Sequence, residues 1–276
     1  MSQRISTGDG RGAASAPLLE CSNLSKTFNP GVPDNRPALD DLSLAVAPGE
    51  FVVIIGSNGA GKSTLLNAIA GMVTPDTGSI RLDGRDITRL APHKRAGMIT
   101  RVFQDPMVGT AAAMTIEENL GLSERRGKRH GFAPHLTAER RARYRELLAT
   151  LNLGLENRLA TAVAQLSGGQ RQALSLIMAV ASRPKLLLLD EHTAALDPRT
   201  AGLVMDATEA AVSRHDLTAI MITHNMQQAI TTGNRLVMMD AGRIKLDISG
   251  NEKSSLTTGD LVEKFKLAND RMLLAG

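Results

Sequence analysis

The chain has 276 residues, of which 42% are hydrophobic and 22% are charged. These fractions are ordinary for a soluble globular protein, and they exclude a fibrous or largely disordered chain. The length allows one large domain with a buried core and room for a smaller inserted subdomain. The net charge is only +4, and aromatic residues make up 2% of the chain with no Trp, which gives little support for binding stacked bases of nucleic acid.

Residues Met1–Pro17 are rich in Ser, Gly and Ala, and we expect a flexible tail because they offer little apolar surface to bury. They lack the apolar stretch of a secretory signal peptide, and no run elsewhere approaches the roughly 20 apolar residues that cross a bilayer. The single cysteine, Cys21, excludes an internal disulfide and fits a reducing compartment. The sequence therefore predicts a protein located in the cytoplasm.

The first part of the chain reads as short strands separated by turn residues. One helix interrupts them, over Ser63–Ala70. The pattern predicts a β-rich lobe around one strand–loop–helix unit. The strands are expected at Leu18–Leu24, Leu42–Val46, Phe51–Ile55 and Ser79–Leu82.

The middle of the chain changes to helical patterns. Thr115–Glu118 has the form of a capping box, and Thr137–Asn152 places its apolar residues on one helical face. We expect a helical insertion at about Pro106–Gln165, between two halves of an α/β core.

Strands and helices alternate in the last third. The apolar runs Leu186–Leu189, Ala219–Ile222 and Leu236–Met239 are typical of buried parallel strands, and helical segments separate them. This alternation predicts an α/β sheet. A short amphipathic helix is expected at Leu256–Leu267, followed by a frayed end.

The segment after Phe51–Ile55 matches the pattern GxxxxGK[ST] in full and leads into an apolar helix. Glycines let such a loop curl so that backbone N–H groups face phosphate oxygens, and the helix N-terminus adds partial positive charge. Lys62 is expected to reach the β- and γ-phosphates, and the Ser63 hydroxyl to ligate Mg²⁺. The pattern alone does not separate an ATPase from a GTPase or a small-molecule kinase. The predicted nucleotide-binding residues of this segment are Gly56, Ser57, Asn58, Gly59, Ala60, Gly61, Lys62, Ser63 and Thr64.

The apolar run Leu186–Leu189 delivers two carboxylates, Asp190 and Glu191, to one end of a buried strand. Alone, two acids at the end of a strand are equally well explained by an exposed turn. Together with the phosphate loop, they predict a catalytic site. Asp190 would hold Mg²⁺ through water, and Glu191 would polarise the water that attacks the γ-phosphate.

A second helix start has the properties of an anion site. Ser167 and Gln170 fit a capping box, and the two glycines between them permit close approach to exposed N–H groups. A plain helix cap would account for the same pair. Because one nucleotide needs only one phosphate loop, two such devices imply either two ligands or a site shared between chains.

The five residues Leu166–Gln170 resemble the signature of the ABC ATPase family, and the match covers roughly residues 18–247. The resemblance implies an α/β fold, with a P-loop NTPase core of ABC ATPase type, an antiparallel β subdomain and an inserted helical subdomain. We expect the ATPase domain at 18–250, with the helical subdomain at about 106–165 and a C-terminal helix and tail at 251–276. The family pairs head to tail, so that one subunit's signature closes on the γ-phosphate held by the other. The signature residues assigned to the nucleotide are Ser167, Gly168, Gly169 and Gln170.

Four further positions match the family's pattern in sequence order. Gln104 resembles the glutamine that senses Mg²⁺ and leads into the region touching the transmembrane partner, and Asp197 resembles the aspartate that links the two active sites. His224 resembles the switch histidine, and a neutral ring there would donate one hydrogen bond to the γ-phosphate while a neighbour orients its other nitrogen. Phe28 occupies the place of the adenine-stacking aromatic, usually a tyrosine.

The chain departs from the family at His192, which follows Glu191 where proline is common. We expect catalysis to survive this exchange. Two explanations stay open at this point: a benign replacement, or a histidine that tunes the pH dependence near Glu191.

The pattern favours the ATPase subunit of a membrane transporter over two alternatives, a cytosolic ABC ATPase acting on ribosomes or DNA and an exporter subunit. Family members that resemble translation factors carry two cassettes in one chain, and DNA-repair members carry long coiled coils. The sequence shows neither feature. The uncharged segment Pro106–Ile116 follows Gln104 and lies where family members dock onto a permease, although core packing would also explain it.

Details around Asp190–Asp197, Phe28–Gly31 and Gly109–Asn119 resemble one subgroup of importer ATPases. These work with a separate permease and an extracytoplasmic solute-binding protein, and they are similar to systems for amino acids, including tryptophan or tyrosine. The resemblance implies ATP and Mg²⁺ as cofactors, and a homodimer or a paired ATPase subunit. It places the protein peripherally at the cytoplasmic face of the cell membrane, with no specific nucleic acid as partner.

Overall fold

A computed structural model describes residues 16–29, 36–127 and 136–264 of the chain. Most of the tail expected at Met1–Pro17, and the part of the expected C-terminal helix beyond residue 264, lie outside the described residues.

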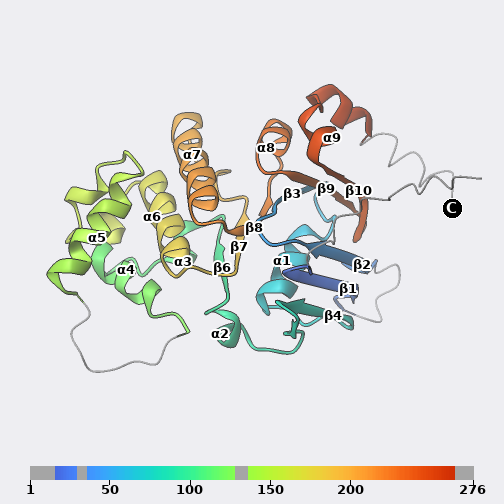
Figure 1. The fold of residues 1–276 in the computed structure, drawn as a ribbon, viewed down its shortest axis with the longest axis horizontal. Coiled ribbons are helices and arrows are strands. Elements are labelled where there is room, and N and C mark those ends of the chain that lie inside the picture. The colour runs from blue at the N-terminus through green and yellow to red at the C-terminus, as the bar shows by residue number, and fades with distance from the viewer. Residues whose placement is uncertain (1–15, 30–35, 128–135, 265–276) are drawn as a thin grey trace, which may run out of the picture.

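The central sheet of the described chain has six strands, and five of them, β9, β3, β8, β7 and β6, run parallel (Figure 1). The sixth, β10, pairs antiparallel with β9 at one edge. In order across the sheet, the strands are β10 Arg243–Ser249, β9 Arg235–Asp240, β3 Phe51–Gly56, β8 Thr218–Ile222, β7 Leu186–Asp190 and β6 Ile99–Val102.

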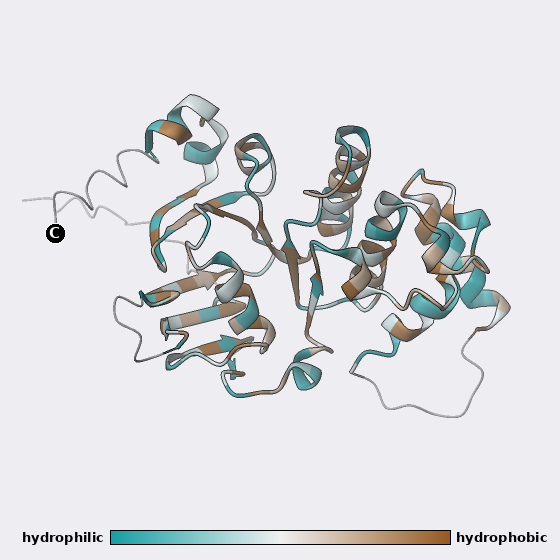
Figure 2. Ribbon diagram, turned by 180° about the vertical axis from the view of Figure 1, so that it is seen from behind, coloured by the Kyte–Doolittle hydropathy of each residue, from teal (hydrophilic) through white to brown (hydrophobic). Residues whose placement is uncertain are grey.

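The inner parallel strands are buried on both faces, because their alternate residues enter two different cores. Val52 and Ile54 of β3 pack in one core with α1, whereas Val53 and Ile55 pack in the other with α6, α7 and α8. Helices therefore cover both faces, and the brown, apolar colour of Figure 2 follows the central strands. The helices are α1 Lys62–Ala70, α6 Gly168–Ala181, α7 Pro198–Arg214 and α8 Met226–Thr231.

A second, antiparallel sheet packs on the α1 side of the central sheet, in the order β2-β1-β4-β5. Buried and exposed residues alternate along β2, as expected when one face of a sheet covers a core. The α/β fold with an additional antiparallel sheet, predicted from the sequence, is confirmed. The strands are β1 Leu19–Lys26, β2 Leu39–Val46, β4 Thr77–Leu82 and β5 Arg85–Asp86.

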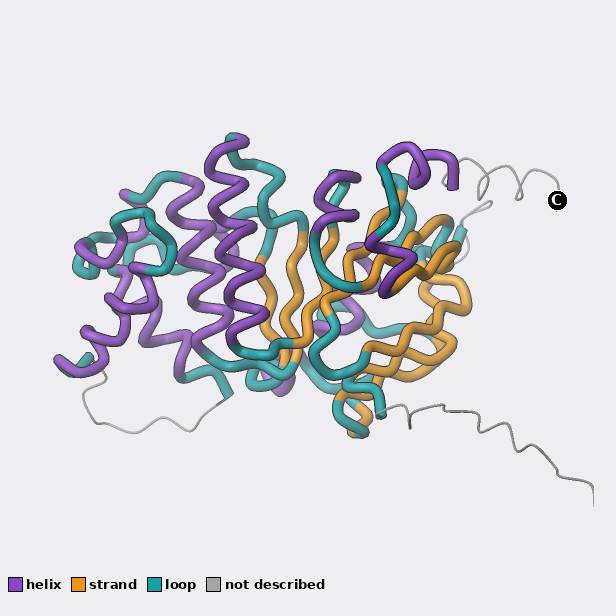
Figure 3. Tube along the Cα trace, turned by 45° about the horizontal axis from the view of Figure 1, so that its top comes forward, coloured by secondary structure: helices purple, strands orange, loops and turns teal. Residues whose placement is uncertain are grey.

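Most of the remaining helices gather at the end of the molecule opposite the antiparallel sheet (Figure 3). A third apolar core, which includes Ile116, Tyr144 and Leu148, holds this group against α6. The expected capping box at Thr115 and Glu118 is present at the start of α4. The helices of this group are α3 Pro106–Gly109, α4 Ile116–Glu124 and α5 Ala138–Ala149, with short 3₁₀ turns at Leu155–Asn157 and Val163–Gln165. Helix α2, Pro92–Arg95, lies apart from them, at the end of α1.

The C-terminal part of the described chain begins with α9, Gly250–Ser254, and residues 258–264 are helical. The latter coincide with part of the helix expected at Leu256–Leu267. Among the described residues, no helix has the length and apolar character needed to cross a membrane.

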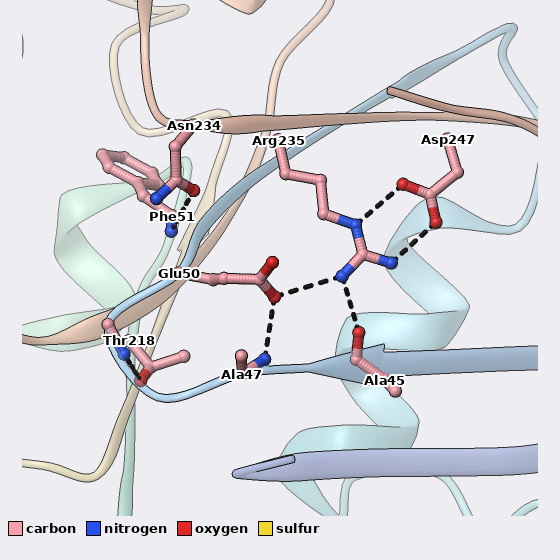
Figure 4. A network of polar contacts seen from close by, with 9 residues as sticks. Ala45, Ala47, Glu50, Phe51, Thr218, Asn234, Arg235 and Asp247 are labelled. Carbon is pink, nitrogen blue, oxygen red and sulfur yellow. Dashed lines mark hydrogen bonds and ion pairs between the residues drawn. The ribbon is translucent and has the colours of Figure 1, made fainter. Parts of the chain in front are cut away.

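A half-buried ion-pair network joins the two sheets where β9 begins (Figure 4). The Arg235 guanidinium donates to both carboxylate oxygens of Asp247, at 2.7 and 2.6 Å, and to Glu50 at 3.1 Å and the carbonyl of Ala45 at 2.7 Å. Glu50 also accepts from the backbone N–H of Ala47 at 2.8 Å. Such a paired, multiply bonded guanidinium fixes the turn between β2 and β3, and hence the position of the strand that leads into the phosphate loop.

Arg95 closes the C-terminal end of α1. Its guanidinium is buried, with 2% of the residue exposed, and donates to the carbonyls of Ala68 and Ile69 at 2.8 and 2.7 Å and to those of Thr88 and Leu90. A cation at a helix C-terminus is favoured by the helix dipole and by the unpaired carbonyls of the last turn. Both ends of α1 are therefore specified, one by the phosphate loop and the other by Arg95.

We expect Arg95→Met to lower the free energy of unfolding by about 3 kcal/mol, because two buried and two partly buried carbonyls lose their bond to the guanidinium. Arg89→Met, at an exposed position of the same segment, is expected to change it by about 0.5 kcal/mol or less. Urea unfolding followed by circular dichroism measures both. Equal stability of the two variants would contradict a capping role for Arg95.

Candidate functional site

The phosphate loop is pre-folded by its glycines and by contacts with two neighbouring turns. Gly56 has φ 157° and Gly61 has φ 95°, and a Cβ on either would lie 2.2 Å from a backbone carbonyl oxygen, of Met239 and Ala38 respectively. Only glycine fits at both positions. The carbonyl of Ala60 also accepts from the N–H of Gly242 at 3.1 Å. The loop therefore packs against the β9–β10 turn.

Lys62 lies inside this loop. Its ammonium donates to the carbonyls of Gly56 and Ser57 at 2.8 and 2.9 Å, and only 7% of the residue is exposed. Burial lowers the pKa of Lys62 from its usual range, and the carboxylates of Glu191 and Asp190 oppose that shift. Lys62 and the two acids at the end of β7 thus lie within electrostatic range of one another.

Glu191 has a left-handed backbone conformation, with φ 45°, directly after β7. This conformation costs a residue other than glycine about 1 kcal/mol, and it persists only where neighbouring structure enforces it. Here the N–H of Glu191 donates to the carbonyl of Ile222 at 3.0 Å, and its carbonyl accepts from the N–H of Ala194 at 3.0 Å. The turn thereby directs the carboxylate away from the line of the strand.

The structure brings Glu191 and His224 together at the ends of adjacent strands. Nδ1 of His224 lies 3.3 Å from a carboxylate oxygen of Glu191, and the His224 side chain is 63% exposed. The contact places the imidazole of the predicted switch histidine beside the carboxylate of the predicted base.

Asp190 pairs with a residue that belongs to none of the sequence motifs. The Arg101 guanidinium, from β6, makes an ion pair with the Asp190 carboxylate and donates to the side-chain oxygen of Asn67 in α1 at 2.6 Å. Arg101 escaped notice because nothing in its local sequence marks it. Only the pairing of β6 with β7 in the structure places it beside Asp190.

The predicted signature residues form the start of α6, where Ser167 and Gln170 make the expected capping box. A Cβ on Gly169 would lie 2.1 Å from Cγ2 of Thr200, so the glycine allows α6 to approach the start of α7. Asp197 is the N-cap of α7 and accepts from the N–H of Thr200 at 3.1 Å. The hydrogen bonds from Thr200 hold the pKa of Asp197 below its usual range. The signature and Asp197 are thus brought together.

The signature does not lie beside the phosphate loop of its own chain. Helix α6 packs on one face of the central sheet and α1 on the other, with β6 and β7 between them (Figure 1). Both helices begin at the edge where the parallel strands end, as β–α–β connections require. The phosphate loop and the signature therefore lie at the same edge of the sheet but on opposite faces.

The other predicted residues surround this edge. Ser63 is exposed and Thr64 half-buried in the first turn of α1, and Gln104 is exposed just after β6. Phe28 is 45% exposed, with the Lys26 ammonium 5.8 Å from the centre of its ring. An exposed ring at this place fits the predicted stacking on a base.

His192 is buried behind the catalytic turn, with 2% of the residue exposed. Its Nε2 lies 3.1 Å from the Thr208 hydroxyl, which in turn donates to the carbonyl of Val204 at 2.7 Å. The hydroxyl proton is thus used, so Nε2–H of His192 is the donor. Burial lowers the pKa of His192 to about 4. The ring is neutral near pH 7 and ties the turn to α7, which disfavours a role in tuning Glu191 near neutral pH.

Comparisons with known proteins agree with this geometry. The family model described as "ABC transporter" matches residues 39–194. The chain is 44% identical to a tyrosine transport ATP-binding protein of Clostridioides difficile, over 91% of this chain and 100% of that protein. It is 42% identical to a sulfate/thiosulfate import ATP-binding protein of Chromobacterium violaceum, over 75% of this chain and 53% of that protein. The chain thus spans only about half of this second relative.

Solved structures show the same fold. The ADP conformation of an ATP-binding cassette of an ABC transporter superposes with a TM-score of 0.73 and 27% identity, over 91% of this chain and 99% of that one. A dimeric bacterial ABC transporter cassette gives a TM-score of 0.72 and 28% identity, over 84% and 98% of the two chains.

Fold and site together define a P-loop ATPase domain, with a phosphate loop after β3, two carboxylates at the end of β7 and a capped helix start at Ser167. On the evidence of the matched family and relatives, the chain belongs to the ABC transporter family. Within it, the chain is of the nucleotide-binding, ATP-hydrolysing subunit type.

We expect the free energy of unfolding to fall as the pH drops from about 6.5 towards 4, in part through His192. The unfolded chain gains a proton near pH 6.5, whereas the folded chain resists it until about pH 4, so stability is present above that window and lost within it. The interval corresponds to about 3 kcal/mol. Urea unfolding at pH 7, 6 and 5 should show a smaller loss for His192→Gln than for the unchanged protein, and equal losses would contradict this assignment.

Proposed function

We propose that this chain hydrolyses ATP to drive the import of an amino acid or related small molecule through a separate permease. The observation that carries the amino-acid assignment is the 44% identity to a tyrosine transport ATP-binding protein over that protein's entire length. A methionine import ATP-binding protein of Rhizobium etli, 40% identical over 75% of this chain and 56% of that protein, supports the same direction.

The proposed nucleotide site follows from the geometry of the phosphate loop. Backbone N–H groups of the loop and the first turn of α1 bind the phosphates, and Lys62 exchanges the carbonyls of Gly56 and Ser57 for phosphate oxygens. The exposed ring of Phe28 receives the adenine. We assign the ATPase domain to residues 18–250, with the helical subdomain at about 106–165.

The residues at this edge fit Mg²⁺. Ser63 and Asp190 offer a hydroxyl and a carboxylate oxygen, which are hard ligands of the kind Mg²⁺ prefers, and the ion usually completes its shell with phosphate oxygens and water. Gln104 follows β6, the strand beside β7, so its amide oxygen is assigned to the same shell. When bound, the ion would supply charge neutralisation at the β- and γ-phosphates.

Glu191 is the proposed base. Its carboxylate would accept a hydrogen bond from the attacking water and hold it in line with the γ-phosphate, a role that needs an acceptor fixed in place before reaction. The left-handed turn at Glu191 and the contact with His224 supply that fixed orientation.

Hydrolysis is proposed to require two copies of the cassette, or this chain with a paired ATPase subunit. In one chain the signature lies on the opposite sheet face from the phosphate loop, so a second copy is needed to cover the γ-phosphate. The similar dimeric bacterial cassette supports this arrangement. Asp197, beside the signature at the start of α7, is assigned to the contact between the two sites.

A permease is the proposed partner of the surface that follows Gln104. Met107 and Val108 of α3 are 46% and 64% exposed, whereas Ile116 at the end of the same uncharged segment is buried in the core. Exposed apolar side chains next to the nucleotide site suit a protein contact. We place the protein peripherally at the cytoplasmic face of the membrane, in a system that includes an extracytoplasmic solute-binding protein.

Glu191→Gln should retain ATP binding and hold the dimer closed, while turnover falls by orders of magnitude because the acceptor of the water proton is lost. Glu146→Gln, at an exposed position of α5, should leave turnover unchanged. Phosphate release and size-exclusion chromatography with ATP measure the two effects. Full hydrolysis by Glu191→Gln would refute the assigned base.

Lys62→Ala should weaken ATP binding strongly, because the ammonium that would face the β- and γ-phosphates is removed. Lys94→Ala, at an exposed position of α2, serves as the control and should bind ATP as the unchanged protein does. Equilibrium titration with a fluorescent ATP analogue measures both affinities. Retention of full affinity in Lys62→Ala would place the phosphates elsewhere.

A further inference from the structure

Arg101 is held at the nucleotide site by three elements of the fold. Its guanidinium makes an ion pair with Asp190 at the end of β7, donates to Asn67 of α1 at 2.6 Å and lies 4.8 Å from the ring centre of Phe103. The Arg101 side chain is 11% exposed and that of Asp190 15%. The two donated bonds and the stacked ring together fix the orientation of the planar guanidinium.

This placement balances the charges of the site before nucleotide arrives. Asp190 and Glu191 provide two negative charges, and Lys62 and Arg101 provide two positive ones. Lys62 interacts with both acids from within the phosphate loop, whereas Arg101 contacts Asp190 directly. In a partly buried site, the attraction between these opposite charges is stronger than it would be in water. Arg101 thus supplies, next to Asp190, the positive charge that a bound cation would otherwise supply.

We propose that Arg101 is a positioning residue, the resident counter-ion of Asp190, which sets how strongly the binding of ATP depends on Mg²⁺. This inference rests on the proposed function, because it takes Asp190 as the carboxylate that faces the ion. The guanidinium orients the carboxylate by holding one of its oxygens and leaves the other for the ion's water shell. Because Asp190 is already neutralised, ATP meets less repulsion in the absence of Mg²⁺.

The direction of the effect follows from the charges. Without the guanidinium, metal-free ATP would face an uncompensated carboxylate and bind more weakly. A divalent cation would then remove a larger repulsion between ATP and the Asp190 carboxylate. The cation would also no longer be repelled by the positive charge of Arg101. The ratio of the ATP dissociation constant in EDTA to that in excess Mg²⁺ should therefore rise when the charge of Arg101 is removed. If Arg101 only stabilised the fold, its loss would change the ATP dissociation constants in EDTA and in Mg²⁺ by the same factor.

The test is equilibrium titration of the full chain with a fluorescent ATP analogue, in EDTA and in excess Mg²⁺. We expect Arg101→Met to raise the ratio by roughly tenfold, a usual size for coupling between two ligands. Arg101→Lys, which keeps the charge without the planar fork, should stay close to the unchanged protein. Arg141→Met removes a guanidinium that donates two bonds to Glu117 in the helical group, and it should leave the ratio unaltered.

A second set of variants, made in the Asp190→Asn protein, separates a counter-ion role of Arg101 from a purely structural one. In Asp190→Asn the counter-ion has no charge to neutralise, so adding Arg101→Met should no longer change the ratio. Asp190→Asn alone should bind ATP more tightly in EDTA, a result that needs no folded Arg101→Met protein. An unchanged or lowered ratio in Arg101→Met, or equal effects in both backgrounds, would overturn the inference. Failure of the unchanged protein to bind ATP would instead contradict the proposed function.

Discussion

The chemistry of this molecule depends on one constraint, that a parallel strand buried on both faces can carry polar side chains only where it ends. Strands β3, β7 and β8 send alternate residues into two cores, so none of their interior positions is available for charge. The phosphate loop, the Asp190–Glu191 pair and His224 each follow one of these strands. Because parallel strands end at one edge, burial itself gathers the charged groups there.

Within that edge, polar contacts from outside the sheet decide how the charged groups point. Glu191 keeps a left-handed backbone through its bonds to Ile222 and Ala194, and Arg101 holds Asp190 from the neighbouring strand. The hydrophobic packing determines where the acids lie, and these bonds determine their direction.

Elements with a local pattern could be predicted from the sequence, whereas contacts between distant residues could not. The phosphate loop, the apolar run of β7 and the capping box at Ser167 are each readable over a few residues. Strand β6 was not predicted because Thr100 and Arg101 interrupt its apolar pattern, whereas β10 was missed although Ile244, Leu246 and Ile248 alternate with polar residues, the pattern of a half-buried strand. The bond between Arg101 and Asp190 joins residues 89 apart, which only the register of β6 on β7 reveals.

Helix α7 connects parts of the site that no single motif contains. Its cap is Asp197, its Thr200 packs against Gly169 of the signature, and two turns later its Thr208 accepts the hydrogen bond from buried His192. A continuous helix moves as a unit, because its own backbone bonds resist bending. One rigid helix therefore contacts both the signature, through Thr200, and the turn that holds Glu191, through Thr208 and His192.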